Sequence, residues 1–422
     1  MRAGLPPRVV TAAARFCRAS PLKKRCCSRT RSSFLSFLSS SVARSSVNNV
    51  NNKNIKMPDV KFCDIGANLV SASPSTFDGF YFGSQVQSHP EDSEDVLERA
   101  KRVGVREILV TAGTLEEAKA AASKCRMWNE KSFTKSSNSI SNDDREEGEE
   151  DEDGSEGVFP KMYSTVGVHP TRCDEFEEKY DGSPERYLEA LKTVVRENAD
   201  VVKAIGECGL DYDRLHFCEK ETQKKYFQFQ FELAKEFDLP LFLHSRNSRE
   251  DFYEILKRNV KHLRKGAVVH SFTGTREEFE ELLALDDKIY IGVNGCSLKT
   301  EENVNVVQSI PLDRMLLETD APWCAVKKTH FGNTFLEGGE NSNRIQTLFG
   351  TPVKPKKWQK GSMIKDRSEP CQIATVCEIV AGCKETSYED VAEACYRNSR
   401  DLFFSPSSSS SYSLNSLYNV VV

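Results

Sequence analysis

The stretch Val201-Val-Lys-Ala-Ile-Gly-Glu-Cys-Gly-Leu-Asp-Tyr212 decides the predicted fold of this chain. It begins as a short apolar run and reaches a carboxylate, Glu207, that stands between two glycines. Short β-branched runs closed by glycine and a polar residue are typical of buried strands. We therefore expect a strand that presents one functional side chain at its carboxyl end.

The same pattern recurs along the chain. Apolar runs also end at Asp64, His169, His244, His270 and Asp320. From His169 to Glu207 and onward, the intervals are 38, 37, 26 and 50 residues, and the last contains a further apolar run at 289–293. Such intervals hold a strand and a helix. The expected strands are 60–64, 107–112, 163–168, 201–206, 241–243, 267–269, 289–293 and 315–317.

Eight strands, each followed by a helical pattern, predict an α/β fold of the TIM (β/α)8 barrel type. The alternative is an open, doubly wound sheet. Such a sheet gathers its functional residues at one switch point, whereas here they end six of the eight strands. The sequence also has no glycine-rich dinucleotide motif and no P-loop. Both observations favour the barrel.

Composition bounds the class of protein. The chain has 422 residues, of which 38% are hydrophobic and 29% charged, which suits a globular protein with a large core. No apolar run has the length of a membrane span, so we expect no membrane partner. We also expect the protein to be a monomer. Fourteen cysteines include no CxxC pair, which is typical of reduced thiols in a reducing compartment.

Three segments differ from the barrel, which we place at 57–404. Residues 1–56 are basic and contain no Asp or Glu, which predicts a transit peptide for a mitochondrion or plastid. The alternative is a disordered tail, with a start at Met57 and a location in the cytoplasm or nucleus. The acidic insertion 129–157 is expected to be disordered. It could bind a basic partner, although a solvated loop without chemistry is the favoured interpretation. Residues 405–422 form a Ser-rich tail.

In a barrel, the carboxyl ends of all strands meet at one mouth, so the residues that end them are expected to face one another. Mixed imidazole and carboxylate ligands suit a divalent cation, and we expect Glu207, His244, His270 and Asp320 to hold it. Such an ion makes hydroxide available at neutral pH. Glu207 could bridge two ions, Asp320 could accept the proton of the water, and His169 could act as an acid or base.

Six motifs carry a resemblance to a known family. They are Asp64-Ile-Gly-Ala-Asn68, Gly167-Val-His-Pro170, Ile205-Gly-Glu-Cys-Gly-Leu-Asp-Tyr212, Leu243-His-Ser-Arg246, Val269-His-Ser-Phe-Thr-Gly274 and Leu317-Glu-Thr-Asp-Ala-Pro-Trp323. In order and spacing they resemble the TatD family of metal-dependent deoxyribonucleases, from about Val60 to Phe404. The resemblance implies a metallo-hydrolase barrel, a Mg-dependent or similar nuclease that is often a 3′ to 5′ exonuclease, and metal ligands at Glu207, His244, His270 and Asp320. Many members carry His-x-His where this chain has Gly66 and Asn68.

Substrate contacts are expected to be local, because the net charge of the chain is −5. Arg246 follows a strand end, and the loop 354–360 interleaves lysines with Trp358. Cations beside an aromatic ring are typical of single-strand binding. The alternative is a solvated basic loop. Arg367-Ser-Glu-Pro370 resembles the family's Arg-x-Glu-Pro, which implies that Arg367 holds phosphate and Glu369 orients it.

These observations predict a divalent-metal-dependent deoxyribonuclease, with Glu207, Asp320 and His169 as catalytic residues. The substrate is DNA, either single-stranded or at 3′ ends. Mg²⁺ is the favoured ion and Mn²⁺ or Zn²⁺ the alternatives, with one or two ions in the site. Two other hypotheses stay open. One is a metal-dependent ester or amide hydrolase, such as an aminoacyl-tRNA deacylase; the other is a non-catalytic scaffold.

Overall fold

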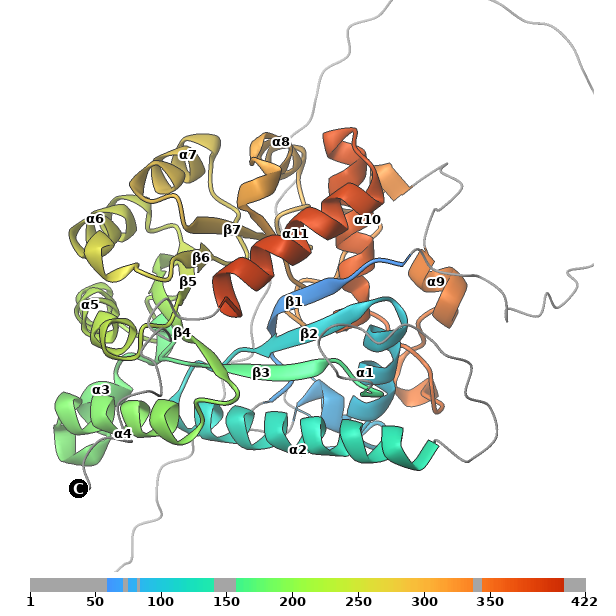
Figure 1. The fold of residues 1–422 in the computed structure, drawn as a ribbon, viewed down its shortest axis with the longest axis horizontal. Helices are drawn as coiled ribbons and strands as arrows, with labels where there is room; N and C mark the ends of the chain where they lie inside the picture. The colour runs from blue at the N-terminus through green and yellow to red at the C-terminus, as the bar shows by residue number, and fades with distance from the viewer. Residues whose placement is uncertain (1–58, 71–74, 82–83, 140–156, 337–343, 406–422) are drawn as a thin grey trace, which may run out of the picture. The chain divides into compact units, whose positions relative to one another are not determined.

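Eight parallel strands form one sheet in the computed structural model, and their spatial order follows the sequence (Figure 1). The structure describes residues 59–70, 75–81, 84–139, 157–336 and 344–405. The whole expected transit peptide, residues 140–156 of the acidic insertion and most of the Ser-rich tail lie outside these ranges. The strands are β1 Phe62–Ala67, β2 Val105–Val110, β3 Lys161–Val166, β4 Val202–Asp211, β5 Leu241–Arg246, β6 Ala267–Val269, β7 Ile289–Val293 and β8 Met315–Leu317.

The sheet closes where β1 meets the segment after β8. Ala67 and Ala321 form a parallel bridge. On either side of it, the Asp320 N–H donates to the Gly66 carbonyl at 2.8 Å, and the Asn68 N–H donates to the Ala321 carbonyl at 2.6 Å. These bonds complete a (β/α)8 barrel, so the predicted fold class is confirmed.

Helices surround the strands (Figure 1). They are α1 Ser93–Arg102, α2 Leu115–Ser139, α3 Glu175–Glu178, α4 Pro184–Glu197, α5 Lys220–Phe237, α6 Arg249–Asn259, α7 Arg276–Leu285, α8 Glu301–Ser309, α9 Arg344–Phe349, α10 Ile373–Lys384 and α11 Tyr388–Phe403. Side chains cap several of them. Ser183 accepts from the Arg186 N–H to begin α4, and Thr275 forms a capping box with Glu278 at α7. Among the described residues, no helix has the length and apolar character needed to cross a membrane.

The start of the acidic insertion was predicted wrongly at residue 129, because α2 continues to Ser139. Polar side chains in this extension bond to the chain around β3. Asn129 donates to the Met162 carbonyl at 2.9 Å and accepts from the Met162 N–H at 2.8 Å, while Ser132 accepts from the Phe159 N–H at 2.8 Å. These bonds pair backbone groups that would otherwise be unsatisfied, which explains why a polar stretch continues the helix.

Alternating side chains divide the core into two clusters. Inside the barrel lie residues such as Ile65, Phe242 and Leu316, all with 0% exposure. Leu402 and Phe403 of α11 belong to this interior cluster, so α11 packs against one end of the barrel interior. The outward-facing residues of the strands pack against the surrounding helices. The core thus fills the interior of the barrel, and the predicted site residues lie at one rim.

Arg367 and Glu369 do not lie where the sequence placed them, in contact with substrate. Arg367 pairs with Asp92 at 2.6 Å and with Glu369 at 2.8 Å, and Glu369 pairs with Arg99 at 2.8 Å. Arg367 is 2% exposed and Glu369 0%. Because both side chains are buried and paired within the protein, we interpret this network as the tie between α1 and the segment before α10.

Candidate active site

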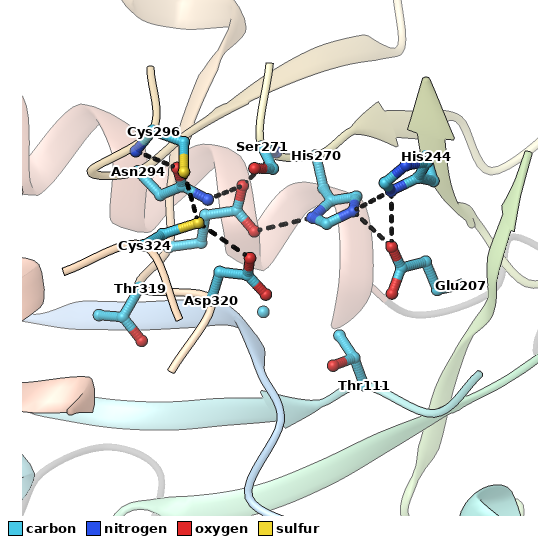
Figure 2. Close-up of polar contacts among 12 residues, drawn as sticks. Thr111, Glu207, His244, His270, Ser271, Asn294, Cys296, Thr319, Asp320 and Cys324 are labelled. Carbon is cyan, nitrogen blue, oxygen red and sulfur yellow. Dashed lines mark hydrogen bonds and ion pairs between the residues drawn. The ribbon is translucent and has the colours of Figure 1, made fainter. Parts of the chain in front are cut away.

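Two imidazoles converge on one carboxylate oxygen at the rim of the barrel (Figure 2). Glu207 Oε1 lies 2.8 Å from His244 Nδ1 and 2.7 Å from His270 Nε2. The two nitrogens are 3.2 Å apart. Three of the four predicted metal ligands therefore lie in direct contact, although they are separated by up to 63 residues in the sequence.

The path of β4 places Glu207 in this position. The register between β4 and β5 shifts between Ile205 and Cys208, and β4 continues to Asp211 rather than ending at Gly206. Gly206 has a φ of +143°, and a Cβ at this position would lie 2.1 Å from the Phe242 carbonyl oxygen. Only glycine permits this approach. The irregularity turns Glu207 toward the mouth from within the strand.

The charges of the site are mutually dependent. Burial raises the pKa of Glu207, but the charge of the nearby His270 imidazole outweighs burial, so the pKa lies well below its usual range. Burial lowers the pKa of His270, yet the carboxylates of Glu207 and Glu318 raise it well above 6.5. A buried carboxylate is thus kept ionised by positive charge beside it.

Glu318 was not predicted as a site residue. It is 0% exposed, its Oε2 lies 3.3 Å from His270 Nδ1, and its Oε1 accepts from the Ser271 N–H. A carboxylate on the second nitrogen of a ligand histidine fixes the ring orientation and its tautomer. The signal was present in Leu317-Glu-Thr-Asp320, where a carboxylate directly follows an apolar run.

His169 lies near the same carboxylate, next to His244. Its Nε2 is 3.6 Å from Glu207 Oε1, and His169, Glu207 and His244 each offer a ligand atom within 4.8 Å of the others. However, its Nδ1 accepts the Thr171 N–H at 3.1 Å, which leaves the proton of the neutral ring on Nε2. Burial lowers the pKa of His169 to about 3, so the ring is neutral. We interpret His169 as a hydrogen-bond donor.

Asp320 is held by two donors in the same cavity. Its Oδ1 accepts from Asn68 Nδ2 at 2.8 Å, and its Oδ2 accepts from Cys324 Sγ at 3.1 Å. Asn68 in turn accepts from Thr111 Oγ1 at 2.8 Å. Burial raises the pKa of Asp320 to about 6. Asn68 thus positions the carboxylate at a place where many family members carry an imidazole.

Gly66 explains why this chain lacks the first histidine of the His-x-His motif that many family members carry. A Cβ at this position would lie 2.5 Å from the Glu318 Oε2 atom. Any side chain here would displace the carboxylate that orients His270. The end of β1 therefore supplies no imidazole, and its contribution to the site is the Asn68 amide.

Asp64, expected as a strand-end residue, is buried within β1 and holds the segment that carries Asp320. Its oxygens accept from the Thr319 N–H at 2.9 Å, from Thr319 Oγ1 at 2.5 Å and from the Gly66 N–H at 3.3 Å. All these groups are buried, so the carboxylate satisfies donors that water cannot reach. Asp64 is a structural support next to the site.

Replacing Asp64 with Ala is expected to lower the free energy of unfolding by about 3 kcal/mol, because two buried N–H groups lose their acceptor. Urea unfolding measures this value. The exposed Asp59→Ala variant is the control and is expected to change stability by less than about 0.5 kcal/mol. A loss below about 1 kcal/mol for Asp64→Ala would contradict the structural role.

A cavity of about 590 Å³ surrounds these groups. It is lined by the four predicted metal ligands, by His169 and by Arg246, as the sequence predicted. The lining residues that were not predicted as site residues include Arg172, Asp211 and Trp323. Asp211 Oδ2 lies 3.3 Å from His244 Nε2, and the Trp323 side chain is 56% exposed. The lining of the cavity thus combines anionic ligands with cations and an aromatic ring.

Trp358 lies apart from this cavity. Its ring stacks on that of His89, with centroids 5.3 Å apart and planes inclined by 19°. A second cavity of about 860 Å³ is lined by its neighbours Lys354 and Lys357 and adjoins the first at Cys324. Lys354 and Lys357 of the loop thus line a cavity next to the site, whereas Trp358 lines neither cavity and the aromatic ring in the active-site cavity is Trp323.

The donor set fits a divalent cation. Asp211 Oδ2 lies 3.3 Å from the buried His244 Nε2 but makes no hydrogen bond with it. His244 Nδ1 and His270 Nε2 meet at 3.2 Å against one carboxylate oxygen. Carboxylates, and imidazole nitrogens that have given up their protons, are the ligands that such ions take. Glu207, His244, His270 and Asp320 are the residues that would hold the ion.

Comparison with known proteins gives consistent matches. The family model "TatD related DNase" matches residues 84–404. "Deoxyribonuclease Tat-D" of Schizosaccharomyces pombe is 39% identical over 345 residues, covering 81% of this chain and 96% of that protein. "3'-5' ssDNA/RNA exonuclease TatD" of Erwinia billingiae is 29% identical, covering 81% and 99%.

Solved structures agree with the sequence matches. A TatD family hydrolase from Entamoeba histolytica superimposes with a TM-score of 0.67 at 32% identity, covering 83% of this chain and 99% of its own. An uncharacterized amidohydrolase from Saccharomyces cerevisiae gives a TM-score of 0.65 at 32% identity, covering 82% and 100%. The family model, the relatives and the barrel with its clustered histidines and carboxylates together show that this chain belongs to the TatD family of DNases.

Proposed function

We propose that this protein is a metal-dependent deoxyribonuclease that removes nucleotides from the 3′ ends of single-stranded DNA. The observation that carries the proposal is the convergence of His244 and His270 on the Glu207 carboxylate inside a cavity with cationic walls. The names of the relatives support the reaction and its polarity. Mg²⁺ is the proposed ion, with Mn²⁺ or Zn²⁺ as alternatives, and the lack of imidazoles at the end of β1 favours one principal ion.

The bound cation would supply a hydroxide nucleophile at neutral pH and neutralise charge on the phosphate. The remaining work belongs to side chains of this chain. Asp320, held by Asn68, is placed to accept a proton from the attacking water. His169 is placed to donate a hydrogen bond from its Nε2–H to a phosphate oxygen. Arg246 and Arg214, which line the cavity, neutralise the remaining phosphate charge.

The second cavity gives the rest of the strand a basic path. Its lining includes five exposed lysines and one exposed aspartate, Asp366: the lysines are Lys327, Lys328, Lys354, Lys357 and Lys365. It adjoins the active-site cavity at Cys324, so a strand whose end lies at Glu207 can continue along it. A local basic groove lets an acidic protein hold a polyanion. We call this surface the lysine groove.

Removing two lysines of the groove is expected to reduce the salt dependence of DNA binding. In Lys354→Ala/Lys357→Ala, the slope of log K against log[salt] should become shallower by about 1.4, because each phosphate contact on a single strand contributes about 0.7. The matched control is Lys356→Ala/Lys360→Ala, which removes two exposed lysines of the same loop that do not line the groove. Equal slopes for the two double variants would exclude the groove from the binding site.

Trp323 is expected to stack on a base of the bound strand. Trp323→Ala should weaken binding of single-stranded DNA by about tenfold, because stacking of one base on an aromatic ring contributes about 1–3 kcal/mol. Trp358→Ala is the matched control, because the Trp358 ring already stacks on His89. The affinity of this variant for single-stranded DNA should stay within about twofold of that of the parent protein. Fluorescence anisotropy with labelled oligonucleotides measures both. Weaker binding by Trp358→Ala than by Trp323→Ala would contradict this assignment.

End-labelled single- and double-stranded DNA tests the proposed function most simply. With Mg²⁺, we expect stepwise shortening from the 3′ end of single strands, loss of activity with a chelator, and recovery when the ion is returned. An aminoacyl ester assayed with the same preparation separates the nuclease from the ester hydrolase. Cleavage of the ester with no cleavage of DNA would overturn the proposal.

A further inference from the structure

Two cysteines face each other at the rim of the active-site cavity (Figure 2). Cys296 Sγ and Cys324 Sγ are 2.8 Å apart, and both residues line the cavity. Among the eleven cysteines that the structure describes, nine are buried, and only these two are partly exposed. Within the described chain, the thiols most open to a dissolved oxidant are therefore also in contact with each other.

The backbone holds this pair together. Cys296 follows β7 and its N–H donates to Asn294 Oδ1 at 2.8 Å. A Cβ at the preceding Gly295 would lie 1.9 Å from the Cys324 carbonyl oxygen, so the two segments are in backbone contact. A disulfide has a sulfur–sulfur length of about 2.05 Å. The sulfurs need to approach by less than about 1 Å to reach it.

Cys324 also connects this pair to the chemistry. Its Sγ donates to Asp320 Oδ2 at 3.1 Å, and Asn68 supplies the donor to the other oxygen. A disulfide sulfur has no proton to donate. Oxidation of the pair would thus remove one of the two side-chain donors that hold the Asp320 carboxylate.

We propose that Cys296 and Cys324 form a reversible disulfide that lowers the nuclease activity, a regulation that rests on the proposed function. The oxidant class is a peroxide. Hydrogen peroxide oxidises one thiol to a sulfenic acid and releases one water. The second thiol then attacks the sulfenic sulfur, forms the S–S bond and releases the hydroxyl as a second water. The two thiol protons and two electrons end in water, and a dithiol reductant reverses the change.

The expected loss of rate is about tenfold. The free energy of one hydrogen bond to a charged group is large enough for its loss to lower the rate about tenfold. Asp320 keeps its bond from Asn68, so we expect a reduced rate rather than its abolition. The Asp320 segment also keeps its support from Asp64, which lies away from the sulfurs on the β1 side.

The experiment treats the full-length protein with hydrogen peroxide and divides each sample. One half is digested without reductant for peptide mass mapping, and the other is assayed on end-labelled single-stranded DNA with Mg²⁺, before and after dithiothreitol. Cys296→Ala is the test variant, because it cannot form the disulfide and keeps the Cys324–Asp320 bond. Cys125→Ala, which removes a buried thiol, is the control.

We expect a linked Cys296–Cys324 peptide pair lighter than the two reduced peptides by two hydrogens. The parent and Cys125→Ala should lose about tenfold in rate and recover with the reductant, while Cys296→Ala keeps its own starting rate. Absence of the linked pair, or a linked pair without a change in rate, would overturn the proposal. An equal peroxide loss in Cys296→Ala would do the same. A reduced parent without nuclease activity would refute the proposed function instead, and the peptide map would still decide whether the disulfide forms.

Discussion

Replacing Glu207 with Gln is expected to reduce DNA cleavage by on the order of 10³-fold or more, with the barrel intact. The Glu207 carboxylate is the group on which His244 and His270 converge, and the imidazoles keep its pKa well below the usual range. Glutamine keeps the size of the side chain but removes its charge, so the site loses its central anionic ligand. Single-turnover cleavage of end-labelled DNA measures the loss, and circular dichroism checks the fold.

Glu117→Gln is the matched control for this variant. Glu117 lines the same cavity and accepts the Gly113 N–H at 2.9 Å, a bond that an amide oxygen can also accept. It is expected to keep its rate within about threefold, because the charge removed is not the one that holds the imidazoles. If Glu207→Gln cleaved DNA as fast as this control, the assignment of Glu207 would be wrong.

His169→Ala is expected to reduce the rate by about 10²- to 10³-fold, because one hydrogen-bond donor to the phosphate is lost, and to leave the affinity for the divalent ion unchanged within about threefold. The reason is the tautomer. The Thr171 N–H occupies Nδ1, so Nε2 carries a proton and serves as a donor rather than as a ligand. Parallel measurement of cleavage and of Mn²⁺ binding by calorimetry separates the two roles. A fall in affinity that matched the fall in rate would make His169 a ligand, as its closeness to Glu207 and His244 would allow.

The barrel, and the meeting of several strand-end residues at one rim, could be predicted because both depend on short-range patterns. A buried parallel strand has an apolar sequence, and a crossover connection must follow each such strand. The intervals between apolar runs therefore indicate the topology of the sheet. Once the topology is assumed, the residues that end the runs must meet. His244 and His270 were placed correctly in this way.

Groups whose roles depend on burial or on a distant partner could not be predicted. Arg367 and Glu369 carry the charges of a phosphate site, but α1 supplies partners for both from far away in sequence. Glu318 shows the reverse case: the sequence places its carboxylate directly after an apolar run, but only the structure shows His270 beside it. The choice between Trp323 and Trp358 likewise needed the cavity, since both rings stand near cations in the sequence.

The central claim is that two imidazoles and two carboxylates of this barrel share a divalent cation. A crystal structure of the protein soaked in Mn²⁺, with anomalous diffraction data, tests it most directly. We predict an anomalous peak at coordination distance, about 2.0–2.3 Å, from ligand atoms of Glu207, His244, His270 and Asp320, and its loss in Glu207→Gln. An ordered site with no peak among these side chains, or a peak retained in Glu207→Gln, would contradict the account.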